Sequence, residues 1–304
     1  MGLYTNGEEG LPSSEELARR SAAPKDDPAP KSAEPDGGDT EGAELAKGGG
    51  SGNSTYAALV WIRDAAITGV VVILLFMFYA GFVTNWKTLA EQDGLKNDLF
   101  ASWSTQTVSP AKEDGGLSYR TDPELVNIPK GDPMAHVSIP ALDVDFTMVS
   151  GVRQSDLSKG PGHYPDSALP GERGNTAIAG HRFGHAGPFR YLDKLEACDE
   201  ITIETGATVR TYSVLSLDGG AAPECVTDED TRRELEAYPE LPGRQIIKPA
   251  DVGVVDPVPH VEQDPVSIAP ENQAPLLTLT TCHPEYGNTE RMVVHAVLTS
   301  EEAK

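Results

Sequence analysis

Cysteine is scarce in this sequence. The 304 residues include 3 cysteines, and no two of them form a CxxC pair. Three cysteines are too few for a disulfide-rich scaffold. The missing CxxC spacing also argues against a zinc ribbon and against a thioredoxin-like redox site. Each cysteine therefore needs its own explanation.

Basic residues are also in short supply. The chain has 24 Lys and Arg against 47 Asp and Glu, which gives a formal net charge of −23 at pH 7. Proteins that bind nucleic acids need Lys and Arg to face the phosphates. The charge balance therefore argues against a nucleic-acid partner and is compatible with an acidic, soluble surface.

The N-terminal segment lacks large apolar residues. Residues 1–54 are mostly Gly, Pro, Ala, Ser and acidic residues, and they end in a Gly- and Ser-rich linker. Such a segment cannot bury enough surface to offset its chain entropy, so we expect a disordered cytoplasmic tail. No apolar stretch lies near Met1, so a cleavable signal peptide is not expected.

A long uncharged run follows the tail. Residues 65–86 carry no charged side chain, and Tyr79 and Trp86 lie late in the run. At about 1.5 Å per residue the run can cross the hydrocarbon core of a bilayer, with its aromatics at the interface. A buried core helix is the alternative. We expect one membrane-spanning helix within residues 55–86, an extracellular domain after it, and a stalk over residues 87–130. Residues 89–103 of the stalk have mild helical periodicity, and the part after them is turn-rich.

Short strand patterns dominate from residue 131 to residue 304. Seven or eight of them, with turn signals between, indicate an all-β barrel or sandwich. Brief helical turns are expected near residues 155–160 and 190–195, and residues 227–245 read as an acidic, partly helical insertion. Two expected strands lie within residues 135–150, divided by Ile139-Pro140, and the others lie at residues 174–181, 199–205, 208–217, 253–258, 275–282 and 291–300.

Three residues with complementary chemistry stand at strand ends. His181 and Cys282 end two of the runs, and Arg291 begins another. If these strands are neighbours, a thiol, an imidazole and a guanidinium converge at one rim, a combination that suits acyl transfer. From spacing alone, Cys282 could instead be a buried structural thiol, half of a disulfide or a metal ligand.

The motifs around these residues resemble those of the sortase transpeptidases. The sequence TLTTC at residues 278–282, with Arg291 nine residues on, resembles the sortase signature, and NTAIAGHR at residues 175–182 resembles its histidine strand. Three further segments are similar to class E sortases of actinobacteria, a housekeeping type: residues 160–175, residues 187–195 and the CHP that begins at Cys282. The resemblance covers about residues 134–300 and implies a sortase-like closed β-barrel of about eight strands.

The resemblance also implies roles for individual residues. Cys282 would be the nucleophile, His181 the general acid and base, and Arg291 the group that steadies the oxyanion. Thr281 and Tyr164 would contact the substrate. The enzyme would cleave a C-terminal sorting motif of the Leu-Pro-x-Thr-Gly or Leu-Ala-x-Thr-Gly type between Thr and Gly, through a thioester and without a metal or other cofactor.

The expected partners follow from that reaction. They are secreted proteins or pilins that carry the motif, an amine acceptor on a cell-wall peptidoglycan precursor, and the cell membrane. A pilus-polymerising sortase and a non-enzymatic, membrane-tethered extracellular β-domain are the alternative functions. Cys198 and Cys225 flank the predicted hairpin; outside the membrane they could bridge, and two free thiols are an equal alternative.

Overall fold

The structure is a computed structural model that describes residues 51–79, 83–104, 117, 119, 121–220, 222–260 and 267–304. The chain divides into two units, Met1–Leu59 and Val60–Lys304. In the first unit only the beginning of helix α2 (Ser51–Phe78) is described. The tail predicted for residues 1–54 therefore lies almost entirely outside the described residues.

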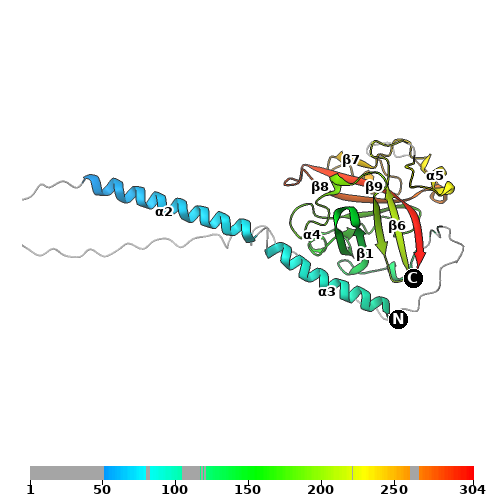
Figure 1. Cartoon of the computed structure of the whole chain (residues 1–304), viewed down its shortest axis with the longest axis horizontal. Helices are drawn as coiled ribbons and strands as arrows, with labels where there is room; N and C mark the ends of the chain where they lie inside the picture. Colours follow the sequence, from blue (N-terminus) through cyan, green and yellow to red (C-terminus); the bar gives the residue numbers. More distant parts are fainter. Residues whose placement is uncertain are drawn as a thin grey trace, which may run out of the picture. The chain divides into compact units, whose positions relative to one another are not determined.

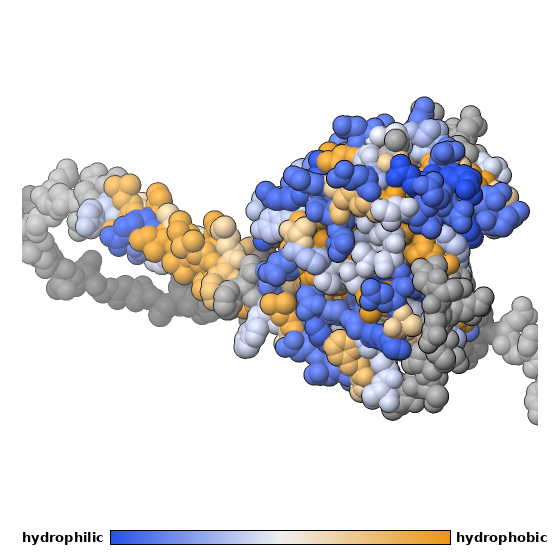
Figure 2. Space-filling view, turned by 45° about the vertical axis from the view of Figure 1, so that its right-hand side comes forward, coloured by the Kyte–Doolittle hydropathy of each residue, from blue (hydrophilic) through white to orange (hydrophobic). Residues whose placement is uncertain are grey.

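Helix α2 carries most of the long uncharged run. Among the described residues, it is the one helix that is long and apolar enough to cross a membrane. Its segment Tyr56–Phe78 contains an 18-residue stretch with a mean hydropathy of 2.1, and none of that stretch is buried. Figure 2 shows apolar side chains gathered along this helix. Helix α2 ends at Phe78, and Trp86, the last residue of the uncharged run, lies on the next helix, α3 (Thr84–Ser104).

A closed β-barrel follows (Figure 1). Its eight strands are hydrogen-bonded in the order β6-β5-β1-β2-β3-β4-β8-β9, and a pairing between β9 and β6 closes the ring. This arrangement confirms the predicted all-β barrel of about eight strands. The strands are β1 (Pro133–Ile139), β2 (Val144–Ser150), β3 (Gly162–His163), β4 (Gly174–Ala179), β5 (Glu200–Glu204), β6 (Thr208–Val214), β8 (Pro275–His283) and β9 (Glu290–Ala303).

The length of β9 explains how the barrel closes. One edge of β9 pairs with β8 over its first half. The other edge pairs first with β7 (Arg244–Ile247) and then, from Ala296 on, with β6. A β-bulge at Thr211/Tyr212 shifts the register where β9 meets β6, and bulges of this kind bend strands at barrel corners. β7 is thus a ninth strand that extends the barrel wall beside the N-terminal half of β9.

Side chains at alternate strand positions fill the barrel interior. On β8, Leu277 and Leu279 belong to the main core cluster, whereas Leu276 packs in a second cluster with Val297 and Tyr238. Successive side chains of a strand point to opposite faces, so β8 is buried on both sides. One side faces the barrel interior, and the other lies under the insertion that carries α5 (Glu229–Leu235).

The short helices agree with the sequence in most places. The turns expected near residues 155–160 and 190–195 correspond to α4 (Gln154–Leu157) and η4 (Leu192–Lys194), and α5 lies in the predicted insertion. Further 3₁₀ turns are η2 (Pro123–Leu125), η3 (Pro140–Leu142) and η6 (Pro270–Asn272).

One predicted strand is wrong. Residues 253–258 do not form a strand, because η5 (Val252–Val255) occupies their first part. The side chain of Asn175 donates hydrogen bonds to the carbonyl oxygens of Val254 and Asp256, both at 3.1 Å. A side-chain amide therefore satisfies backbone groups that a neighbouring strand would otherwise bind.

A disulfide anchors the start of the insertion. Cys198 and Cys225 are bonded, with an S–S distance of 2.16 Å, and Cys282 is the free cysteine. The sequence left open a disulfide or two free thiols for these two cysteines, and the structure has the disulfide. It joins the segment before β5 to the segment before α5, across a separation of 27 residues.

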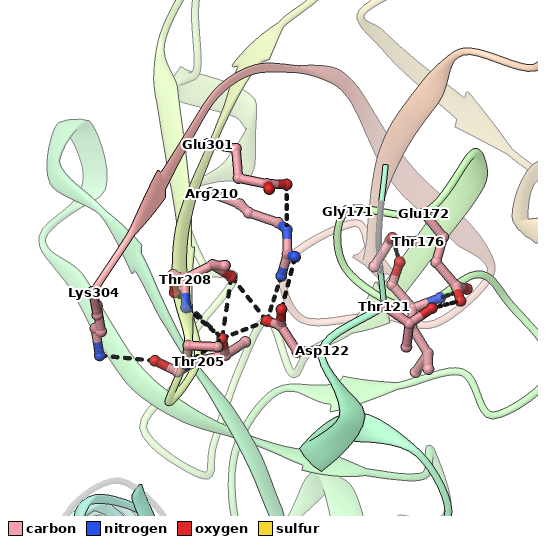
Figure 3. A network of polar contacts seen from close by, with 12 residues as sticks. Thr121, Asp122, Gly171, Glu172, Thr176, Thr205, Thr208, Arg210, Glu301 and Lys304 are labelled. Carbon is pink, nitrogen blue, oxygen red and sulfur yellow. Dashed lines mark hydrogen bonds and ion pairs between the residues drawn. The ribbon is translucent and has the colours of Figure 1, made fainter. Parts of the chain in front are cut away.

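A buried ion-pair network lies at the β6 end of the barrel (Figure 3). Arg210 donates to both carboxylate oxygens of Asp122, at 2.6 and 3.0 Å, and to Glu301 at 3.1 Å. The hydroxyl groups of Thr205 and Thr208 donate to the same Asp122 carboxylate. Arg210 is fully buried and shares a face of β6 with Tyr212, a member of the main core cluster. The network ties the segment before β1 to the barrel end opposite Arg291.

Candidate active site

Three neighbouring strands bring the predicted catalytic residues to one edge of the barrel. β4 and β8 run parallel, with Ala179 opposite Thr280, so their C-terminal ends lie side by side. The pairing continues past β4, where the Gly180 N–H donates to the Thr280 carbonyl at 3.0 Å. His181 and Cys282 are the next residues along these two strand ends. The convergence that the sequence predicted for them is thus present in the strand register.

Arg291 lies across from the thiol on the other side of β8. Cys282 and Arg291 are register partners in the antiparallel β8–β9 ladder. Directly opposed residues in such a ladder have Cβ atoms about 4.5–5.5 Å apart. The Arg291 Nη1 donates to the carbonyl oxygens of Asn288 at 3.0 Å and of Glu290 at 2.8 Å. The guanidinium is therefore held by carbonyl groups of its own β8–β9 turn.

The thiol points to the outer face of the barrel wall. Cys282 shares its face of β8 with Thr278 and Thr280, opposite the interior face of Leu277 and Leu279. Thr278 is buried under a polar network: its hydroxyl donates to Asn175 at 2.7 Å and contacts His295 at 2.9 Å. Burial lowers the pKa of His295 to about 3, so this ring is neutral and structural.

His181 has a desolvated ring. Burial lowers its pKa, and the nearby His185 lowers it further because two imidazolium charges would repel. The rings of His181 and His185 stack with centroids 4.8 Å apart and planes at 25°. The amide nitrogen of Gln154 on α4 lies 3.4 Å from the His181 Nε2. An imidazole that stays neutral near pH 7 can accept a proton from a thiol.

A tight contact fixes the backbone just before His181. Phe189 is fully buried, and its ring lies against Gly180. A Cβ at position 180 would come within 2.4 Å of that ring, so a side chain cannot fit without moving Phe189. The Phe189 N–H also donates to the His181 carbonyl at 3.1 Å. Glycine at this position therefore allows the close packing that sets where His181 leaves the strand.

The predicted substrate-contact residues have defined partners. Thr281 is buried, and its hydroxyl donates to the Gly180 carbonyl at 2.8 Å, which fastens β8 to the end of β4. The Tyr164 hydroxyl lies 3.2 Å from the Thr280 hydroxyl, on the same face of β8 as Cys282. Substrate contact by Thr281 and Tyr164 stays a prediction, and the structure adds a strand-fastening role for the Thr281 hydroxyl.

A pocket of about 270 Å³ opens beside the thiol. Phe183 and Tyr286 are exposed aromatics that meet edge to face, with ring centroids 5.0 Å apart. The carboxylate of Glu285 accepts a hydrogen bond from Arg190 at 3.0 Å. The pocket is lined by His181, Arg182, Phe183, Cys282, Glu285, Tyr286 and Gly287. It places exposed aromatic side chains beside the Cys282 thiol and the His181 imidazole, a combination of apolar and polar groups that is typical of ligand-binding pockets.

Arg182 is a site residue that sequence reasoning missed. It is buried, donates to Asp193 at 3.0 Å, and its Nη1 lies 2.7 Å from His283 Nδ1. His283, the residue directly after Cys282, is therefore a partner of Arg182. The available signal was a second arginine directly after the candidate base. No set of three or more His, Cys, Asp or Glu among the described residues is placed to hold a metal ion.

Comparison with known proteins places this site in a family. Residues 137–299 match the family described as "Sortase domain". The chain is 28% identical over 250 residues to Sortase SrtE1 of Streptomyces coelicolor, covering 80% of this chain and 58% of that protein. It is 27% identical over 279 residues to Sortase SrtE2 of the same organism, covering 87% of this chain and 93% of that protein. The chain thus spans less than two thirds of SrtE1.

A solved structure agrees with the sequence matches. The SrtF sortase from Corynebacterium diphtheriae is 34% identical, with a TM-score of 0.54, and the match covers 66% of this chain and 94% of that one. The two SrtE relatives confirm the class E resemblance. Because the family match spans more than half of the sequence and includes both strand ends of the site, this chain belongs to the sortase family of cysteine transpeptidases.

Proposed function

We propose that this protein is a membrane-anchored class E sortase that cleaves a Leu-Ala-x-Thr-Gly or Leu-Pro-x-Thr-Gly motif between Thr and Gly. The observation that carries the proposal is the register of three adjacent strands. It sets Cys282 beside His181 on the parallel neighbour and opposite Arg291 on the antiparallel one. The pocket at this edge offers an exposed aromatic wall for a peptide.

The proposed reaction has two steps, which are formation of a thioester on Cys282 and transfer of the acyl group to an amine. The Cys282 sulfur attacks the threonine carbonyl carbon, and the thiol proton passes to His181. The resulting imidazolium gives that proton to the glycine nitrogen as the Thr–Gly bond breaks, which leaves a thioester. An amine then attacks the thioester, His181 takes the amine proton, and the peptide is released on a new amide bond as Cys282 regains its proton.

Two features support an extracellular barrel anchored by α2. The segment Tyr56–Phe78 has the length and composition of a membrane span. Disulfides such as Cys198–Cys225 persist in oxidising compartments outside the cytoplasm. On this proposal the substrates are secreted proteins or pilins that carry the motif, and the acceptor is an amine of a cell-wall precursor.

The thioester provides the direct test. The full chain in detergent is expected to form a covalent adduct with a peptide containing Leu-Ala-Ala-Thr-Gly, with release of the fragment that begins at glycine. Adding hydroxylamine should convert the adduct to a threonine hydroxamate and restore the free thiol. Intact-mass spectrometry follows both species. If neither the adduct nor the hydroxamate forms from Leu-Ala- or Leu-Pro-type peptides, the proposed function is wrong.

Arg291 is expected to act on kcat. Replacing Arg291 by alanine should lower kcat about 10²–10³-fold, the usual effect of losing one oxyanion donor. Lysine should restore little, because its single ammonium cannot reproduce the planar set of guanidinium donors. The control is Arg233→Ala, which removes one exposed arginine of α5 and should leave kcat unchanged. A kcat within threefold of wild type in Arg291→Ala would remove this residue from the mechanism.

A further inference from the structure

Helix α3 is docked on the barrel through hydrogen bonds that resemble strand pairing. The side-chain amide of Gln92 donates to the Thr147 carbonyl at 2.9 Å and accepts from the Thr147 N–H at 2.7 Å. It also donates to the Lys159 carbonyl at 2.7 Å. Thr147 lies on β2, where the two-residue strand β3 does not reach. Gln92 thus fills a gap in the sheet, and this fixes the position of α3 along β2.

The first turns of α3 reach the loop that follows His181. The Asn85 Oδ1 accepts a hydrogen bond from the Ala186 N–H at 3.0 Å. The Thr88 hydroxyl lies 3.5 Å from His185 Nδ1 and donates to the Ser158 carbonyl at 3.3 Å. Thr88 is 2% exposed, so its own side chain is shielded from water, whereas its partners are partly buried. The same helix turn therefore touches the His181 loop and the end of α4, which carries Gln154.

The contacted loop has an unusual backbone. Gly184, His185, Ala186 and Gly187 all have positive φ, at 71°, 47°, 60° and 52°. Residues with side chains visit this region mostly as single residues, because the Cβ crowds the following carbonyl. Two in succession persist only where surrounding structure holds them. The contacts from Asn85 and Thr88 fall on those two residues, His185 and Ala186.

The held loop presents the His185 ring to His181. The centroids of the two rings are 4.8 Å apart, and the side-chain amide of Gln154 makes a second contact with the His181 ring, at its Nε2 atom. Moving the backbone at His185 would move the surface against which His181 rests. A continuous set of contacts therefore leads from α3 through His185 to the imidazole beside Cys282.

We propose that α3 is a brace for the active site, in which Asn85 and Thr88 are positioning residues that set the orientation of His181 through His185. This proposal rests on the assignment of His181 as the catalytic base under the proposed function. It gives the segment between α2 and the barrel a part in the acylation step, beyond that of a spacer.

Paired substitutions of similar shape test the brace in the full chain in detergent. Asn85→Leu with Thr88→Val removes the acceptor and the hydroxyl and keeps the side-chain volumes similar. Asn85→Asp with Thr88→Ser keeps an oxygen at both places. The assay uses a fluorogenic Leu-Ala-Ala-Thr-Gly peptide with hydroxylamine, and kcat is expressed per folded enzyme. The Leu/Val pair is expected to lower kcat about tenfold or more with KM within twofold, since small displacements of a catalytic group are costly.

The controls separate positioning from stability. The Asp/Ser pair and Asp93→Asn, an exposed change on α3, should keep kcat within twofold of wild type. His185→Ala should reproduce the loss, and its combination with the Leu/Val pair should add little, because both act through one path. Three outcomes would each overturn the brace. The Leu/Val pair could keep wild-type kcat, the two pairs could lose kcat equally, or the losses from the Leu/Val pair and from His185→Ala could multiply when combined.

His181→Ala in the same assay distinguishes the two proposals. It should abolish transfer if the proposed function is right. If it is inactive while the Leu/Val pair has wild-type kcat, only the brace is wrong. If it keeps wild-type activity, His181 is not the base, and the proposed function fails together with the brace that depends on it.

Discussion

Replacing Cys282 by serine is expected to lower kcat/KM by at least about four orders of magnitude and to prevent any covalent adduct with the peptide. The substitution exchanges sulfur for oxygen at nearly the same place, so the pocket keeps its shape. A serine hydroxyl ionises far less readily than a thiol, and a neutral His181 is a weak base for it. Losing a nucleophile outright usually removes nearly all of the catalysis that the group of residues provides. Initial rates and intact-mass spectrometry measure both effects.

The chain provides its own control for this variant. Cys282 is the free cysteine, and the other two are joined in a disulfide. A thiol-alkylating reagent should therefore add one label to the wild-type protein and abolish transfer, and it should add no label to Cys282→Ser. The variant should keep the wild-type melting temperature within about 2 °C, because the site is half-exposed and the change in volume is small. Activity above one hundredth of wild type would reassign the nucleophile.

The non-enzymatic alternative makes the opposite prediction. A tethered β-domain that only binds ligands would tolerate Cys282→Ser without loss of its function. The strand register weighs against that reading, because it places a thiol, an imidazole and a guanidinium on three adjacent strand ends. A ligand-binding wall alone needs none of the three.

The placement of Cys282 and Arg291 was predictable from the sequence because both residues lie on regular strands, and His181 follows the end of β4 by two residues. Alternating apolar residues define β8 and β9, and two residues on such strands keep a fixed register once the strands pair. The β4 pattern ends at His181 in the same way. The relation between Cys282 and Arg291 is thus encoded by local strand patterns and a short turn, both of which a sequence displays.

The surroundings of the site depend on contacts that no local pattern displays. β7 has a single buried residue, Ile247, so its four residues carry too little alternation to stand out. Arg182 was missed because its partners, Asp193 and His283, come from separate segments. In the sequence, Gln92 is one polar residue of the predicted stalk. Its role depends on the fold, because Gln92 binds the part of β2 that β3 does not reach. Such long-range polar contacts follow from the assembled fold.

Removing the carboxylate of Asp122 is expected to have the largest effect on stability. In Asp122→Ala, the fully buried Arg210 keeps Glu301 and loses two charge-assisted hydrogen bonds, while Thr205 and Thr208 lose their common acceptor. Breaking one side of a buried ion pair costs about 3–5 kcal/mol, because a charge is left poorly compensated in a low-dielectric interior. Thermal and urea unfolding in detergent, followed by near-UV circular dichroism, measure the loss. The matched control is Asp230→Ala, which breaks an exposed pair with Arg233 and should change the unfolding free energy little.

The pH dependence of that loss tests its electrostatic origin. Burial raises the pKa of Asp122, but the hydrogen bonds and charge of Arg210, with the two threonine hydroxyls, outweigh burial and hold the pKa below its ordinary value. At pH values between the lowered pKa of Asp122 in the folded protein and its ordinary pKa in the unfolded chain, the unfolded chain binds more protons. The carboxylate therefore stabilises the fold fully above about pH 4. This contribution disappears as the pH falls through the lowered pKa of the folded state. The stability gap between wild type and Asp122→Ala should therefore be constant from pH 7 to about pH 5 and narrow below pH 4. A gap that stays constant down to pH 2 would show that Asp122 acts through packing and not through its charge.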